Sequence, residues 1–146
     1  MKLLLQRVSQ ASVSVNGEEI GRIGRGILAL VGVERDDSEE QVSKLTERML
    51  NYRLFADADG KTNLSVRDIG GGVLLVSQFT LAADTRRGLR PGFSLAAAPA
   101  LAERLYARML AQLSTETVVQ IASGRFAADM QVSLINDGPV TFLLEG

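Results

Sequence analysis

The amino-terminal segment Met1–Val33 has the apolar pattern of β-strands. Within Lys2–Val15, alanine and valine at positions 11, 13 and 15 alternate with serine, which predicts a long, half-buried strand. The dipeptide Asn16-Gly17 follows, the strongest two-residue signal for a hairpin turn. Ile20–Ile23 and Ile27–Val33 are predicted as further strands, and a three-stranded meander is the simplest arrangement.

Two later segments have the apolar spacing of amphipathic helices. Asp36–Ser38 offers an N-cap, and acidic residues follow in the first turn. Apolar residues then recur at helical spacing up to a predicted end near Asn51: Val42, Leu45, Met49 and Leu50. Pro99–Leu113 is predicted as a second helix, because it begins with proline and carries one leucine and methionine stripe.

The remaining segments complete an α/β fold. Tyr52–Phe55 is predicted as a short strand and Asp57–Gly60 as a turn. Val73–Val76 is an unbroken apolar run after three glycines, which predicts a strand buried on both faces. Three further strands are expected near the carboxyl end: Thr117–Ile121, Met130–Ile135 and Val140–Leu144. Ala82–Leu95 is rich in Arg, Gly and Pro, and a loop of this length is usually functional.

Composition narrows the class of protein. A chain of 146 residues that is 46% hydrophobic fits one domain, residues 1–146. There is no cysteine and no apolar run long enough for a membrane helix, so we expect a cytoplasmic protein without disulfides. The net charge of −1 does not indicate a strongly basic nucleic-acid-binding domain, although Arg86, Arg87 and Arg90 form a local basic cluster.

The chain contains no histidine. Together with the absence of cysteine, this excludes Ser-His and Cys-His nucleophilic machinery and the usual zinc sites. No cluster of ligands suggests an integral metal ion, and no cofactor is expected.

The candidate chemistry lies directly after the buried strand, in Ser77, Gln78, Phe79 and Thr80. In one interpretation these polar groups only satisfy the backbone at a strand end. In the other, N–H groups around Phe79 and Thr80 form an oxyanion hole, and Gln78 or the Thr80 hydroxyl positions a substrate. Threonine as a nucleophile would need a base that the chain lacks, so a positioning role is favoured.

Other residues have both a structural and a functional interpretation. Asp84 and Asp129 are possible carboxylate bases, but a turn or an ion pair with Arg86 or Arg87 is favoured for Asp84. Met130 is either core filling or the wall of an apolar pocket. Gly138-Pro139 stands between two apolar stretches, where proline marks a strand start, an edge or a special backbone site; a cis bond there would direct two successive carbonyls the same way, as a polar clamp.

Seven segments, in this order and spacing, resemble the D-aminoacyl-tRNA deacylases over the whole chain: Gln6–Val8, Ala11–Val13, Gly32-Val33, Asn63-Leu64, Ser77–Leu81, Gly124–Met130 and Asn136–Thr141. The resemblance implies mixed and antiparallel sheets in a barrel-like arrangement with two or three helices. It also implies hydrolysis of the ester between a D-amino acid and tRNA, aided by the 2′-hydroxyl of the tRNA ribose.

The resemblance further implies a homodimer with active sites at the subunit interface. Ser77–Thr80 of one subunit would face a cis Gly138-Pro139 of the other, which rejects L-amino acids but admits glycine. The resemblance assigns Arg7, Asn136 and Met130 to the same substrate-selecting site and Arg86, Arg87 and Arg90 to tRNA binding. One departure is Gly92, where the family commonly has serine, and it affects a loop hydroxyl only.

Three alternatives remain open. An editing hydrolase of the same fold would accept L-amino acids through a trans Gly-Pro. A non-catalytic nucleic-acid-binding homologue would use the arginine loop without the pocket and show steep salt dependence. A structural dimer would use Gly138-Pro139 only as a turn.

Overall fold

The computed structural model describes all residues, 1–146. The strands are β1 (Lys2–Val15), β2 (Glu18–Ile23), β3 (Gly26–Gly32), β4 (Phe55–Ala56), β5 (Thr62–Leu64), β6 (Gly72–Ser77), β7 (Gln120–Ser123) and β8 (Gln131–Glu145). The helices are α1 (Glu39–Asn51), α2 (Val66–Ile69), the 3₁₀ turn η1 (Phe79–Ala82) and α3 (Pro99–Leu113). The predicted α/β class is confirmed.

β1 organises the main sheet because it is long enough to pair with three strands. Its carboxyl half pairs with β2 and its amino half with β3, both antiparallel, while β8 runs along its other edge. The predicted meander is therefore wrong: β3 pairs with β1 and not with β2. The hairpin at Asn16-Gly17 is present, with positive φ at both residues, and the returning chain makes β2 and then β3 along the same edge of β1.

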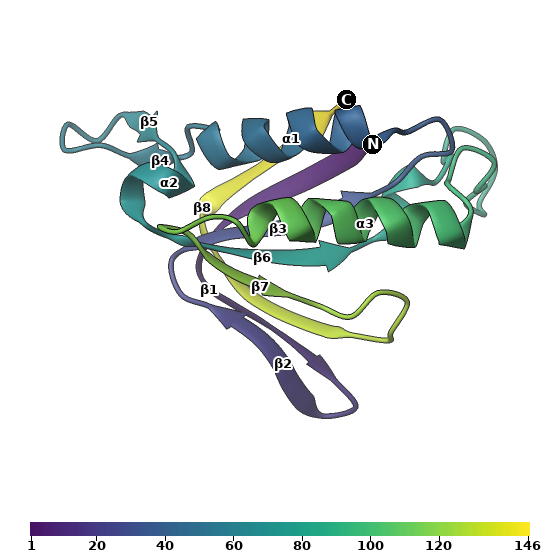
Figure 1. The fold of residues 1–146 in the computed structure, drawn as a ribbon, viewed down its shortest axis with the longest axis horizontal. Helices are drawn as coiled ribbons and strands as arrows, with labels where there is room; N and C mark the ends of the chain where they lie inside the picture. The colour runs from purple at the N-terminus through teal and green to yellow at the C-terminus, as the bar shows by residue number, and fades with distance from the viewer.

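β6 and β7 extend the sheet in parallel from β3. The sheet then curls, so that Gly21 in β2 lies against the Ser123 carbonyl in β7 and the barrel is nearly closed (Figure 1). This arrangement confirms the predicted mixed sheets in a barrel-like form.

Two apolar cores fill the two faces of the sheet. Figure 1 shows α1 and α3 on one face, where they cover the larger core. The smaller core lies inside the curl and includes Val8, Val13 and Leu74. Along β6, Val73 and Leu75 belong to the first core and Leu74 and Val76 to the second, which confirms a strand buried on both faces.

Both long helices form where the apolar spacing predicts them. Ser38 caps α1 and its N–H donates to the Gln41 side chain at 2.6 Å, while the predicted apolar residues are buried. α3 begins at Pro99 and buries Leu105, Met109 and Leu113 against the same core. None of the helices is long and apolar enough to cross a bilayer.

Several short elements differ from expectation. Tyr52–Leu54 is irregular and only Phe55–Ala56 forms a strand, because its partner β5 is three residues long. The strand predicted at Thr117–Ile121 begins later, at Gln120, where pairing with β6 begins. The two last predicted strands are one continuous strand, β8, since β1 pairs with its whole length apart from irregularities around Gly138-Pro139.

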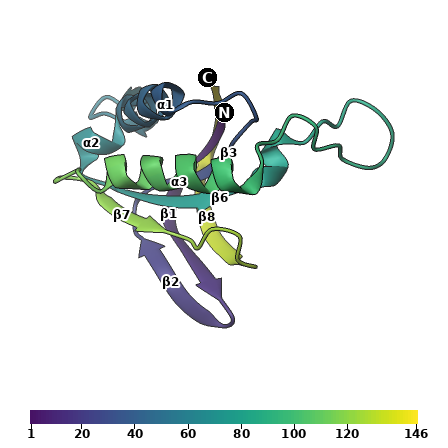
Figure 2. The ribbon, with the colours of Figure 1, turned by 45° about the vertical axis from the view of Figure 1, so that its right-hand side comes forward.

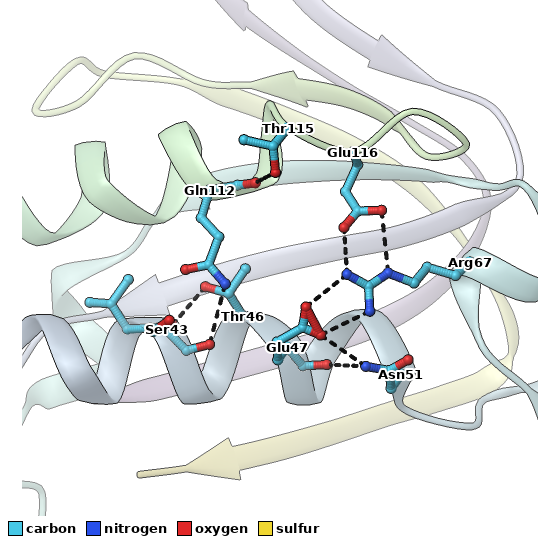
Figure 3. A network of polar contacts seen from close by, with 9 residues as sticks. Ser43, Thr46, Glu47, Asn51, Arg67, Gln112, Thr115 and Glu116 are labelled. Atoms are coloured by element: carbon cyan, nitrogen blue, oxygen red, sulfur yellow. Dashed lines mark hydrogen bonds and ion pairs between the residues drawn. The ribbon is translucent and has the colours of Figure 1, made fainter.

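The short helix α2 is absent from the predicted elements, yet it ties three segments together. Ser65 caps it, because its hydroxyl oxygen accepts from the Asp68 N–H. The Asp68 carboxylate in turn accepts from the Ser65 N–H at 2.8 Å. From α2, Arg67 pairs with Glu47 of α1 and with Glu116 after α3, at 2.8 and 2.5 Å (Figure 3). These bonds raise the pKa of Arg67 and fix α1 and α3 at the end of the molecule away from the Ala82–Leu95 loop.

Candidate active site

The motif Ser77–Thr80 lies where β6 leaves the sheet. The parallel pairing of β6 with β3 ends at Ser77, and the Gln78 N–H still donates to the Val31 carbonyl at 2.7 Å. The chain then turns into η1, which packs so tightly on Gly32 that a Cβ there would come within 2.7 Å of the Leu81 Cβ. A side chain at position 32 would therefore displace the motif.

The polar side chains of the motif bind one another. The Gln78 Nε2 donates to the Thr80 hydroxyl oxygen at 2.5 Å. Phe79 and Thr80 occupy the first positions of a 3₁₀ turn, where N–H groups have no partner inside the turn. Phe79 is 63% exposed, and its ring lies 5.2 Å from that of Phe93 on the returning part of the Ala82–Leu95 loop.

A cavity of about 490 Å³ opens beside this motif. Its lining is mostly apolar and comes from β3, β6, α3 and the segment 126–132; it includes Ser77, Gln78, Phe79, Ala102, Tyr106, Phe126 and Met130. No carboxylate lines it. The cavity therefore has the apolar walls and few polar groups of a small-molecule site.

Met130 is held at the cavity wall by its neighbours. Gly124 leaves room for it, since a Cβ at position 124 would lie only 2.6 Å from the Met130 sulfur. Between them, Ala127 adopts a left-handed backbone with φ of 63° and lines the same cavity. This conformation costs a non-glycine residue about 1 kcal/mol or more and often marks functional segments.

Tyr106 is a cavity residue that the sequence does not single out. Its hydroxyl donates to the Leu75 carbonyl at 3.0 Å, and burial raises the pKa of Tyr106 to about 12. The phenol is therefore neutral near pH 7 and is not a general base there. The sequence gives one signal for this role: Tyr106 lies beside Leu105 on the buried face of α3, which packs on β6.

Gly138-Pro139 lies elsewhere in the chain, opposite Arg7 in β1, and its peptide bond is cis. Arg7 donates from Nε to the Asp137 carbonyl at 2.7 Å and from Nη1 to the Leu54 carbonyl at 2.8 Å. Asn136 closes the segment, because its side-chain oxygen accepts from the Val140 N–H at 2.8 Å. Arg7 and Asn136 thus hold the backbone on both sides of the Gly-Pro pair.

The Gly-Pro pair and the Ser77–Thr80 motif are not brought together within one chain. Ser77 pairs with Val31, which pairs with Leu3, whereas Arg7 lies four residues further along β1. Four residues span about 13 Å and three strand spacings about 14 Å, so the two groups are about 19 Å apart along the sheet. Gly138 and Pro139 do not line the cavity.

The basic cluster lies on a loop beside the motif. Arg86, Arg87 and Arg90 are all exposed. Asp84 accepts from the Arg86 guanidinium at 2.8 and 2.7 Å, so this carboxylate is engaged in an ion pair, and the pair holds its pKa well below the usual range. Asp84 therefore has the structural role favoured for it.

The structure contains no group of three or more His, Cys, Asp or Glu residues that could hold a metal ion. The polar groups that the site itself offers are backbone N–H groups, the Gln78 amide and hydroxyls.

Comparisons with known proteins agree with this geometry. Residues 4–145 match the family described as D-Tyr-tRNA(Tyr) deacylase. Proteins named D-aminoacyl-tRNA deacylase are 60% identical over 145 residues in Azotobacter vinelandii (99% of both chains) and 61% identical over 142 residues in Alkalilimnicola ehrlichii (97% of this chain, 94% of the relative).

Two solved structures share the fold. The c-Myc DNA Unwinding Element Binding Protein is 43% identical, with a TM-score of 0.94 over 100% of this chain and 99% of its own. A probable eukaryotic D-amino acid tRNA deacylase is 17% identical, with a TM-score of 0.84 over 98% and 97% of the two chains, which shows the fold alone. The family match and the identities agree over almost the whole length, so this chain belongs to the D-Tyr-tRNA(Tyr) deacylase family of hydrolases.

Proposed function

We propose that this enzyme hydrolyses the ester bond of D-aminoacyl-tRNA and releases a free D-amino acid and tRNA. The observation that carries this proposal is the Ser77–Thr80 motif at the mouth of an apolar cavity without a carboxylate or a histidine. Aminoacyl esters are activated enough to be hydrolysed by orientation and oxyanion stabilisation. The names of relatives at about 60% identity support the same substrate.

In this proposal the N–H groups of Phe79 and Thr80 stabilise the negative charge on the carbonyl oxygen. Water attacks the ester carbon, the bond to the ribose 3′-oxygen breaks, and that oxygen receives a proton. The neighbouring 2′-hydroxyl of the tRNA assists the proton transfers, because no side chain in the cavity titrates near neutral pH. Gln78, bound to the Thr80 hydroxyl, positions the ester.

Chirality is selected by a second copy of the chain. The Ser77–Thr80 motif lies about 19 Å from Gly138-Pro139 in the same chain, so a homodimer is needed to bring the two groups together. The main-chain carbonyls of Gly138 and Pro139, in a segment that Arg7 and Asn136 hold on its two sides, would leave no room for an L side chain. Met130 forms the apolar wall beside the ester. Glycyl-tRNA would pass this filter, because glycine has hydrogen at both positions.

The exposed arginines Arg86, Arg87 and Arg90 would bind the tRNA backbone beside the cavity. Charged tRNA is a cytoplasmic substrate, and we place the enzyme there.

The test is single-turnover deacylation of D-tyrosyl-tRNA and L-tyrosyl-tRNA by the purified protein. Loss of the D ester alone supports the proposal, and a D-tyrosyl-tRNA that ends in 2′-deoxyadenosine should then react far more slowly. Equal rates would refute exclusion of L substrates and favour an L-accepting editing hydrolase. Binding of tRNA with steep salt dependence but no hydrolysis would favour a non-catalytic nucleic-acid-binding protein.

The role of the Gly-Pro pair is tested with Pro139→Ala. A mixture of Pro139→Ala chains and chains with inactive motifs, such as the double variant Gln78→Ala, Thr80→Val, checks the contribution of the second copy. If the two groups act across the interface, mixing Pro139→Ala chains with motif-inactive chains restores one intact site per mixed dimer. A change in stability with unaltered chiral selectivity in Pro139→Ala would favour the structural-dimer alternative.

A further inference from the structure

Leu89 is the most exposed large apolar side chain of the protein. Its exposed fraction is 104%, so its side chain is fully open to solvent. It lies in the loop that Figure 2 shows projecting from the body of the molecule between η1 and α3. Two arginines flank it, Arg87 on one side and Arg90 on the other, and both are exposed.

Two backbone hydrogen bonds between Asp84 and Gly92 close the base of this loop. The Asp84 N–H donates to the Gly92 carbonyl at 2.7 Å, and the Gly92 N–H donates to the Asp84 carbonyl at 3.0 Å. The Arg86 guanidinium is held by Asp84, and the Phe79 and Phe93 rings tie the loop to the motif. The leucine is therefore presented by a closed loop that is anchored at the candidate active site.

We propose that Leu89 packs on the exposed face of the last base pair of the tRNA acceptor stem, with Arg87 and Arg90 on the flanking phosphates. This inference rests on the proposed function. An apolar side chain between arginines is complementary to the end of a nucleic-acid helix, where a flat apolar base face lies between two phosphate strands. Base faces accept apolar and aromatic side chains with little dependence on sequence.

The reach of the loop fits this position. From Phe93 back to Leu89 the chain extends at most about 14 Å. The 3′ end of tRNA carries about four unpaired nucleotides, which span at least about 14 Å, at about 3.4 Å or more each, once they turn away from the helix and leave its last base pair uncovered. With the 3′ ester at the motif, these single-stranded nucleotides are long enough to let the end of the stem meet the tip of the loop.

The experiment compares Leu89→Ser with wild type on two substrates, D-tyrosyl-tRNA and D-tyrosyl-adenosine, which has the ester but no helix. We expect kcat/KM on D-tyrosyl-tRNA to fall at least about fivefold and the rate on D-tyrosyl-adenosine to stay unchanged. Leu89→Met should keep the activity on both substrates. Val118→Ser is the matched control, since Val118 is 59% exposed on another part of the surface and should have no effect.

Binding of uncharged tRNA, measured at one salt concentration, gives a readout that does not need hydrolysis. Leu89→Ser should weaken this binding at least about fivefold and leave binding of a single-stranded CCA oligonucleotide unchanged. Unchanged tRNA binding and rate in Leu89→Ser would overturn the proposal, as would an equal loss on both substrates. A change in the mass of the assembly would also overturn it, because Leu89 would then contact a second copy of the chain. If the wild type hydrolyses neither ester but Leu89→Ser weakens tRNA binding, the proposed function fails and the contact with the helix end stands.

Discussion

Gly124→Ala tests whether the cavity wall depends on the close approach of Gly124 and Met130. The added Cβ would lie 2.6 Å from the Met130 sulfur, whereas ordinary contacts begin at 3.4 Å. The sulfur must therefore move by at least 0.8 Å, the difference between these two distances. The sulfur lies near the end of a flexible side chain, so this overpacking costs only about 1 kcal/mol, the low end of the usual range, and it displaces a residue of the cavity wall.

The magnitude is measured by a double-mutant cycle in urea. We expect Gly124→Ala to lower the free energy of unfolding by about 1 kcal/mol in the wild type and by under about 0.5 kcal/mol in a Met130→Ala background. Single-turnover deacylation of D-tyrosyl-tRNA should fall in Gly124→Ala and recover in part in the double variant.

An equal loss of unfolding free energy for Gly124→Ala in both backgrounds would refute the reasoning, because the loss would then not come from contact with the Met130 sulfur. Gly24 offers a matched control, since a Cβ there meets nothing within 4 Å. Gly24→Ala should change the free energy of unfolding by less than about 0.5 kcal/mol and should leave the deacylation rate unchanged.

Three further predictions concern charge and the cavity. Arg67→Met leaves the half-buried Glu116 unpaired and should lower the free energy of unfolding by about 1–3 kcal/mol, with unchanged deacylation at 25 °C, as urea unfolding and kinetics would show. The bond from Arg67 lowers the pKa of Glu47 below its usual 4.5, so the stability advantage of wild type over Glu47→Gln should be present at pH 7 and vanish as the pH falls below about 4.5; an advantage that persisted in acid would contradict this. Arg87→Gln should reduce the slope of log Kd for tRNA against log salt by roughly 0.7–1, whereas Arg22→Gln, on β2 and away from the loop (Figure 2), should leave it unchanged.

Local pattern determined the elements that depend on short-range physics. The capped, periodic segment of α1 and the proline-initiated α3 form at the predicted positions, since spacing and capping act within a few residues. The hairpin at Asn16-Gly17 and the doubly buried β6 were likewise readable, because turn chemistry and an unbroken apolar run leave few alternatives. The resemblance of the motifs also identified the family before any geometry was known.

The pairing between strands that are distant in the sequence could not be predicted from the apolar pattern. Apolar alternation shows which face of β3 is buried, but not that β1 is its partner in place of β2. The continuity of β8 through Gly138-Pro139 depends on β1, which supplies partners on both sides of the irregular segment.

The candidate site shows the same division. The sequence by itself determined which polar residues follow β6 and that no histidine accompanies them. Only the tertiary structure decided that Tyr106, Phe126 and Met130 converge beside the motif, and that Gly138-Pro139 does not, because a cavity is formed by side chains from elements that are far apart in the chain. Strand order and curl set those distances, and they result from packing of the whole sheet rather than from any local segment.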